Sequence, residues 1–461
     1  MDTEMSEDNS KPDSASVAED KDDFQKAIST LDSVDEEKID GSTLSTPIDE
    51  DSSQKKTGRK EAAKSTPANE DRHGDDISRN SVDDSPSTKQ KRPLDEELSI
   101  EGIVFQAPGS DRLFIDRFDL SQTFFNLQTS MKQKKWKLSL EQNVHFALAA
   151  TSILLITPSK YPEQLQQFFT EKEWAETSDR IQDLYGIKRK PMPVDTVSNM
   201  LCIIDNLMNK TINREEAVVS LMKLPLDEYE HKFSQALGGL ILKLMRVPMD
   251  EDANETELCS RFIDPFLTGL LDAPDQGICL RWINDATLEA KTYADFTKNR
   301  PNLCITKCCG VKWKSSLAYG EVKPAIREKN HFSLCKDLLK VAVFCKDALD
   351  HQLMQGTLGI QITGRTIKFY LLTLPAKGLY VMIELATIKI PDSLQDLPRF
   401  VPELPNVLKI LDVFHRVCVP VIDVASAKNR YTPTLPHQKF DQLFTISKDR
   451  KKPCHLKIRH N

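Results

Sequence analysis

Several features are missing from this sequence of 461 residues, and each absence excludes a class of protein. The opening residues are polar and acidic, unlike a secretory signal peptide. The longest apolar run, Val144 to Ile156, is too short to span a bilayer and predicts a buried helix. The ten cysteines are not spaced like a secreted disulfide framework, which favours reduced thiols. We therefore expect an intracellular protein with no membrane partner.

The short motifs of the commonest enzyme classes are also absent. The sequence has no glycine-rich phosphate loop with a lysine, no Gly-x-Ser-x-Gly and no His-Glu-x-x-His. NTPase, serine hydrolase and zinc protease functions therefore have no support. Cys304, Cys308 and Cys309 lie close together, but no matching Cys-x-x-Cys pair follows. Buried or half-exposed thiols are favoured over zinc ligands at these positions.

Apolar residues are rare in residues 1–97, which are mostly Ser, Asp, Glu, Lys and Pro. Such a segment cannot bury enough apolar surface to offset its conformational entropy, so we expect a disordered acidic arm. Two basic groups in the arm resemble a nuclear import signal, and ordinary solvated charges are the alternative. These groups are Lys55, Lys56, Arg59 and Lys60, then Lys89, Lys91 and Arg92.

The rest of the chain divides by its pattern into three segments. Residues 98–250 repeat apolar positions at three-and-four spacing between prolines, which predicts a mainly helical domain. Residues 251–420 mix helical and strand patterns, which predicts an α/β domain. Residues 421–461 form a basic C-terminal tail. Hydrophobic residues make up 39% of the chain, enough for a sizeable core.

The α/β segment opens with a helix that has recognisable local signals. Asn254 lies three residues before Glu257, as in a capping box, and Pro265 should kink or restart the helix. Gly364 and Arg365 predict a tight hairpin turn. Strands are expected at residues 278–283, 303–306, 316–323, 358–363, 366–374 and 380–389, with helices at 331–355 and 401–417.

Charged residues at the end of one predicted strand give the clearest chemical signal. Glu321 and Lys323 form a Glu-x-Lys pattern, and strand alternation places both on one face. Arg300, Pro301 and Asn302 open the preceding strand, at a distance that suits a hairpin. In its order of helix, three strands, long helix and strand, this segment resembles the αβββαβ core of the PD-(D/E)XK nuclease superfamily.

The resemblance implies Mg²⁺-dependent cleavage of phosphodiester bonds in DNA or RNA. It assigns Glu321 and the residue at 302 as metal ligands, and Lys323 as the group that orients water or neutralises developing charge. The family has Asp where this chain has Asn302, so one anionic ligand is lost. Asp295, or Asp285 further upstream, is expected to supply the missing charge.

Each assignment has a non-catalytic alternative. The resemblance makes Glu257 an additional catalytic acidic residue, but Glu257 is equally well explained as the reciprocal cap of Asn254. Glu321 and Lys323 can form a surface ion pair on an edge strand. For the whole chain, the alternative is a catalytically degenerate nuclease fold that serves as a nucleic-acid- or protein-binding scaffold. Asn302 favours the scaffold, whereas Glu321 with Lys323 favours the enzyme.

A basic run with one aromatic residue lies in the helical segment. It consists of Lys134, Lys135, Trp136 and Lys137. Lysines that meet phosphates and a ring that stacks on a base would make this run a nucleic-acid-binding site. The alternative is a solvated helix face with the ring packed inward.

Overall fold

A computed structural model describes residues 103–133, 138–158, 161–292 and 300–433, and the single positions 435, 444, 445, 454 and 456. Contacts divide the chain into two units, residues 1–95 and 96–461, and all described residues belong to the second. The predicted arm, the basic run at residues 134–137, Asp295 and most of the C-terminal tail lie outside the described residues.

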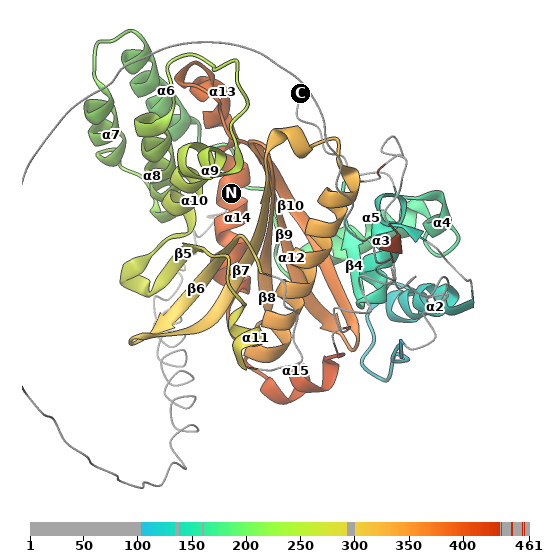
Figure 1. The fold of residues 1–461 in the computed structure, drawn as a ribbon. Helices are drawn as coiled ribbons and strands as arrows, with labels where there is room; N and C mark the ends of the chain where they lie inside the picture. The colour runs from blue at the N-terminus through green and yellow to red at the C-terminus, as the bar shows by residue number, and fades with distance from the viewer. Residues whose placement is uncertain are drawn as a thin grey trace, which may run out of the picture. The chain divides into compact units, whose positions relative to one another are not determined.

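A seven-stranded mixed sheet forms the centre of the second unit (Figure 1). Its strand order is β4-β10-β9-β8-β7-β6-β5. Only the pairs β7–β8 and β10–β4 are parallel, and the other neighbours are antiparallel. The prediction of an α/β fold is therefore confirmed at this level. The strands are β4 (Ile153–Ile156), β5 (Ile278–Trp282), β6 (Leu303–Cys309), β7 (Lys312–Lys323), β8 (Gly356–Thr363), β9 (Thr366–Ala376) and β10 (Leu379–Lys389).

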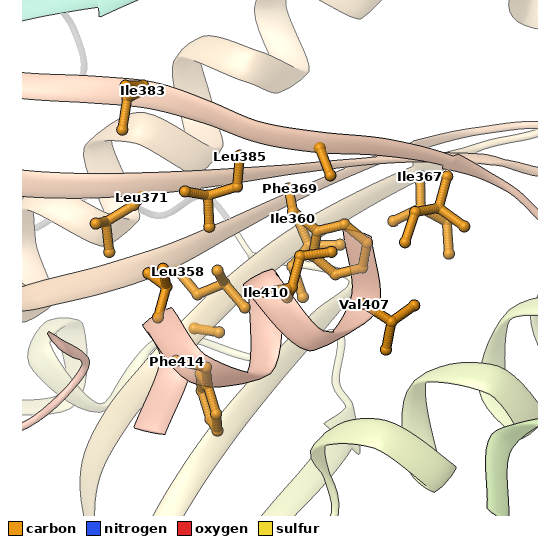
Figure 2. Close-up of a cluster of buried hydrophobic side chains, with 14 of the residues drawn as sticks. Leu358, Ile360, Ile367, Phe369, Leu371, Ile383, Leu385, Val407, Ile410 and Phe414 are labelled. Carbon is orange, nitrogen blue, oxygen red and sulfur yellow. The ribbon is translucent and has the colours of Figure 1, made fainter. Parts of the chain in front are cut away.

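Two long helices cover opposite faces of this sheet. α12 (His331–Gln352) connects β7 to β8, and a crossover of this kind is what allows two consecutive strands to run parallel. α14 (Leu404–Val417) packs on the other face, where Val407, Ile410 and Phe414 meet apolar side chains of the sheet (Figure 2). Both helices match the predicted ranges closely.

Strand alternation sorts the residues of β7 between the two helices. Ala318 and Val322 belong to the apolar cluster that includes α14, whereas Tyr319 belongs to the cluster on the α12 side. The Tyr319 ring lies 5.5 Å from that of Phe344 on α12. Because side chains alternate with a period of two, Glu321 lies on the same side as Tyr319. The end of β7 therefore directs its charged residue toward α12.

The predicted buried helix from Val144 to Ile156 is wrong in its second half. The helix α3 ends at Ala150, Ser152 adopts a positive φ of 67°, and the remaining apolar residues form β4. β4 pairs in parallel with β10, a partner more than two hundred residues away in sequence. The segment predicted as mainly helical therefore also contributes an edge strand to the sheet.

Three local signals of the α/β segment act as expected, although only the Asn254 half of the predicted capping box forms. Asn254 accepts a hydrogen bond from the Glu257 N–H at 3.0 Å, which caps α9 (Glu255–Glu257). A π-helical turn then precedes α10 (Asp264–Leu271), so the helix is interrupted next to Pro265, which has no N–H to donate. Gly364 takes the predicted hairpin turn with a φ of 53°.

The remaining elements surround this core. No helix among the described residues is long and apolar enough to cross a lipid bilayer. The helices not yet given are α2 (Leu120–Gln133), α3 (Leu140–Ala150), α4 (Glu163–Gln166), α5 (Glu171–Leu184), α6 (Val194–Met208), α7 (Arg214–Met222), α8 (Glu228–Lys243), α11 (Leu288–Thr292), α13 (Leu397–Phe400) and α15 (Val424–Arg430). Short strands pair as β1 (Phe114–Ile115) with β2 (Phe118–Asp119) and β3 (Leu138–Ser139) with β11 (Phe444–Thr445).

Candidate functional site

Four charged side chains meet between the end of β7 and the first half of α12. Glu321 and Lys323 come from the strand. Asp337 and Lys340 come from the helix, where a separation of three residues places them on one helical face. We call these four residues the charged centre. Because α12 follows β7 in the chain and packs against it, the two pairs lie together.

Each lysine of the charged centre contacts both carboxylates. Lys340 Nζ lies 3.4 Å from Glu321 Oε1 and 3.9 Å from Asp337 Oδ1. Lys323 Nζ lies 3.9 Å from Glu321 Oε2 and 3.3 Å from Asp337 Oδ2. The two carboxylates are therefore bridged by the same two ammonium groups. In this arrangement two negative and two positive charges balance.

Burial dominates the electrostatics of the charged centre. Glu321 is only 2% exposed, and burial raises the pKa of its carboxyl to about 7, with Lys340 and Lys323 opposing and Asp337 adding to the rise. Burial likewise raises the pKa of Asp337, partly offset by Lys323 and Lys340. Asp337 Oδ2 accepts no well-aligned hydrogen bond, although Lys323 is close. A buried oxygen of this kind can accept a further cation.

Asn302 has a structural position next to the charged centre. Its Oδ1 accepts a hydrogen bond from the Val322 N–H at 2.9 Å, and its own N–H donates to the Gly320 carbonyl at 3.1 Å. The Asn302 carbonyl accepts from the Ile283 N–H at 2.9 Å. Asn302 therefore ties together the adjacent ends of β5, β6 and β7. Its amide oxygen is already engaged by the backbone.

The other predicted site residues lie elsewhere or outside the description. Glu257 makes an ion pair with Arg261 at 3.0 Å, so its carboxylate does not return to cap Asn254. The partner of the Glu257 carboxylate is Arg261 and not a residue of the charged centre. Asp285 is an exposed partner of Lys291. Asp295 cannot be assessed because it lies outside the described residues.

Asn302 also lines a cavity of about 480 Å³. It is lined by Asp264, Trp282 and the exposed Glu255, among others. The indole N–H of Trp282 donates to Asp264 Oδ1 at 2.6 Å, which fixes the ring at the cavity wall. The charge of Glu255 contributes to the raised pKa of Asp337, so this cavity and the charged centre are electrostatically linked.

Asp337 and Lys340 are the residues that sequence reasoning missed. Their signal was present, because both are charged residues on a long helix whose neighbours Leu338 and Leu339 are buried. An acidic residue on the buried side of such a helix needs a partner. The identity of that partner depended on which strand the helix covers.

Comparisons with family models, with curated proteins and with solved structures found no match to this chain. The assignment of function therefore depends on the fold and on the charged centre alone.

Proposed function

We propose that this chain is a divergent metal-dependent nuclease in which Asp337 supplies the carboxylate that Asn302 lacks. The element order supports the resemblance to PD-(D/E)XK enzymes: α10 is followed by the β5-β6-β7 meander, α12 and the parallel strand β8. This is the αβββαβ order that the resemblance implies. Glu321 and Lys323 lie at the end of the third strand of that order.

One observation carries the proposal: a second buried carboxylate lies beside Glu321. A second carboxylate strengthens the site, because Asn302 is neutral and each anionic oxygen ligand adds affinity for a hard cation such as Mg²⁺. Asp337 contacts both of the lysines that contact Glu321. The two carboxylates thus face the same pair of ammonium groups, and the proposal places a shared cation between them.

The residues present fit Mg²⁺ as a cation that is bound together with its substrate. The described residues contain no cluster of three or more His, Cys, Asp or Glu side chains. Mg²⁺ is nevertheless often held by only one or two carboxylates plus substrate phosphates. Glu321 and Asp337 would hold it here, and Asp337 Oδ2, which now faces Lys323 Nζ at 3.3 Å, would be one of the ligand atoms. When bound, the ion supplies Lewis-acid polarisation of the phosphoryl oxygen.

The two lysines would act on the phosphate rather than on the carboxylates alone. The side chains of Lys323 and Lys340 are each about one fifth exposed, whereas the carboxylate of Glu321 between them is buried. A cation placed between Glu321 and Asp337 would release these ammoniums toward a bound phosphodiester. There they would neutralise the charge that develops in the transition state.

A second candidate function is a degenerate nuclease fold that acts as a binding scaffold. Two specific observations favour it. The charged centre is already balanced by its own lysines, so a divalent cation must displace at least one of them. The amide oxygen of Asn302 is engaged by the Val322 N–H. In this case the four charges would be a structural network under α12.

A cleavage assay separates the two functions. The full-length protein is incubated with single- and double-stranded DNA and RNA in Mg²⁺ or Mn²⁺, beside Asp337→Asn, Lys323→Ala and Asn302→Asp. The nuclease proposal expects cleavage by the wild type, and a loss of roughly 10²- to 10³-fold in Lys323→Ala because a transition-state contact is removed. It expects a comparable loss in Asp337→Asn and little change in Asn302→Asp, whose carboxylate keeps the bond to Val322.

The matched control is Asp195→Asn, which removes an exposed carboxylate from the first turn of α6 and should leave cleavage unchanged. A wild type that is inert while Asn302→Asp cleaves would identify a degenerate enzyme whose other groups remain in place. If the wild type and Asn302→Asp are both inert on every substrate, cleavage is not the function and the scaffold is the correct assignment.

A further inference from the structure

The hairpin between β6 and β7 is a basic, largely exposed surface at the opposite end of β7 from the charged centre. The sequence from residue 296 to residue 320 contains no acidic residue, although the whole chain has a net charge of −7. Three lysines of this stretch lie on the hairpin near its turn, namely Lys307, Lys312 and Lys314. In Figure 1 this hairpin projects at the left of the view. Positive charge is therefore concentrated on one projecting element.

The hairpin also exposes apolar and aromatic surface. Val311 at the turn is fully exposed, and Trp313 keeps 42% of its surface accessible. The Arg281 guanidinium of β5 lies 4.2 Å from the centroid of the Trp313 ring, which holds the ring in place through a cation–π contact. Gly310 supplies the positive φ, 56°, that the two-residue turn requires. A large ring held in this way at a surface is available for stacking.

We propose that the β6–β7 hairpin binds single-stranded nucleic acid, with Trp313 stacking on a base and Lys307 and Lys312 contacting phosphates. This inference rests on the proposed function, because it names the substrate class that the charged centre would cleave. Exposed aromatic rings beside lysines are the usual means of binding single strands. A duplex offers phosphates to the lysines but hides its base faces from a stacking ring.

The hairpin and the charged centre are separable by mutation. Glu321 lies nine residue steps along β7 from Lys312, which is about 30 Å of extended chain. Lys307, Lys312 and Trp313 are exposed, so replacing them should not disturb the core. Binding and cleavage can therefore fail independently.

Binding is measured by fluorescence anisotropy with a labelled single-stranded oligodeoxynucleotide of about 20 nucleotides, in EDTA, with the full-length protein. Trp313→Ala should weaken binding roughly tenfold, and Trp313→Phe should retain most of the affinity because a phenyl ring still stacks. Lys307→Gln with Lys312→Gln should reduce the slope of log affinity against log salt by about 1.4, since two phosphate contacts are lost.

Lys172→Gln with Lys223→Gln is the matched control, because it removes the same charge from exposed positions on other elements. Its salt slope should equal that of the wild type. The inference is overturned if the hairpin variants bind like this control, or if no binding occurs. It is also overturned if the duplex of the same sequence binds equally well and Trp313→Ala has no effect.

These outcomes are distinct from those of the cleavage assay. Hairpin-dependent binding without cleavage in any metal would refute the nuclease and leave the hairpin as a binding surface. Cleavage that depends on Asp337, with binding unaffected by the hairpin variants, would refute only the role of the hairpin.

Discussion

Replacing Glu321 with glutamine tests the electrostatics of the charged centre while nearly preserving its shape. The pKa of this carboxyl is raised from an ordinary 4.5 to about 7, mainly by burial. Ionising it therefore costs the folded protein roughly 3 kcal/mol more than it costs the unfolded chain. The pKa of Glu321 is higher in the folded than in the unfolded protein, so the contribution of the protonated carboxyl to stability is fully present below pH 4.5. This contribution is lost as the pH rises through 7.

The assay is urea denaturation in EDTA at several pH values between 4.5 and 8, with the wild type and Glu321→Gln measured side by side. The unfolding free energy of the variant minus that of the wild type should rise by roughly 3 kcal/mol over this pH range, because glutamine does not titrate. A constant difference between the two proteins would come from lost ion pairs and is not part of the prediction. Only the change of the difference with pH reports the Glu321 titration.

A second variant checks the cause. Lys340→Gln removes a cation that lowers the pKa of Glu321. In this variant the loss of stability with rising pH should therefore extend to higher pH than in the wild type. The reasoning is refuted if the difference between the wild type and Glu321→Gln stays flat from pH 4.5 to 8. Burial would then not raise the pKa of the Glu321 carboxyl in the folded protein.

Two predictions concern the core that supports this site. Lys346 is fully buried with its Nζ 2.6 Å from Asp350 Oδ2, so Lys346→Met should cost about 3–5 kcal/mol by leaving a buried charge unpaired, measured by urea denaturation. Adding Asp350→Leu should recover part of that loss, and no recovery would argue against the pairing. Phe414 lies in the cluster of Figure 2, and Phe414→Ala should cost about 3–5 kcal/mol of stability in thermal denaturation. Val219→Ala, at an exposed position, should cost far less, and equal costs would contradict the packing of α14.

The strands from β5 to β10 could be predicted from the sequence because their signals are local. Apolar alternation, short apolar runs and the turn at Gly364 depend only on neighbouring residues. The capping role of Asn254 and the break at Pro265 are local for the same reason. β4 could not be predicted in this way. The run from Ile153 to Ile156 suits a buried helix or a buried strand, and only its pairing with β10 decides between them.

The same distinction between local and long-range information holds for the candidate site. The period of a strand determined that Glu321 and Lys323 share a face, and the period of a helix places Asp337 with Lys340. The sequence by itself determined no more than these two pairs. Only the tertiary structure brought them together, because the crossover from β7 lays α12 across that strand. The backbone of β7 also engaged the amide of Asn302, since the Val322 N–H needs an acceptor where β6 begins.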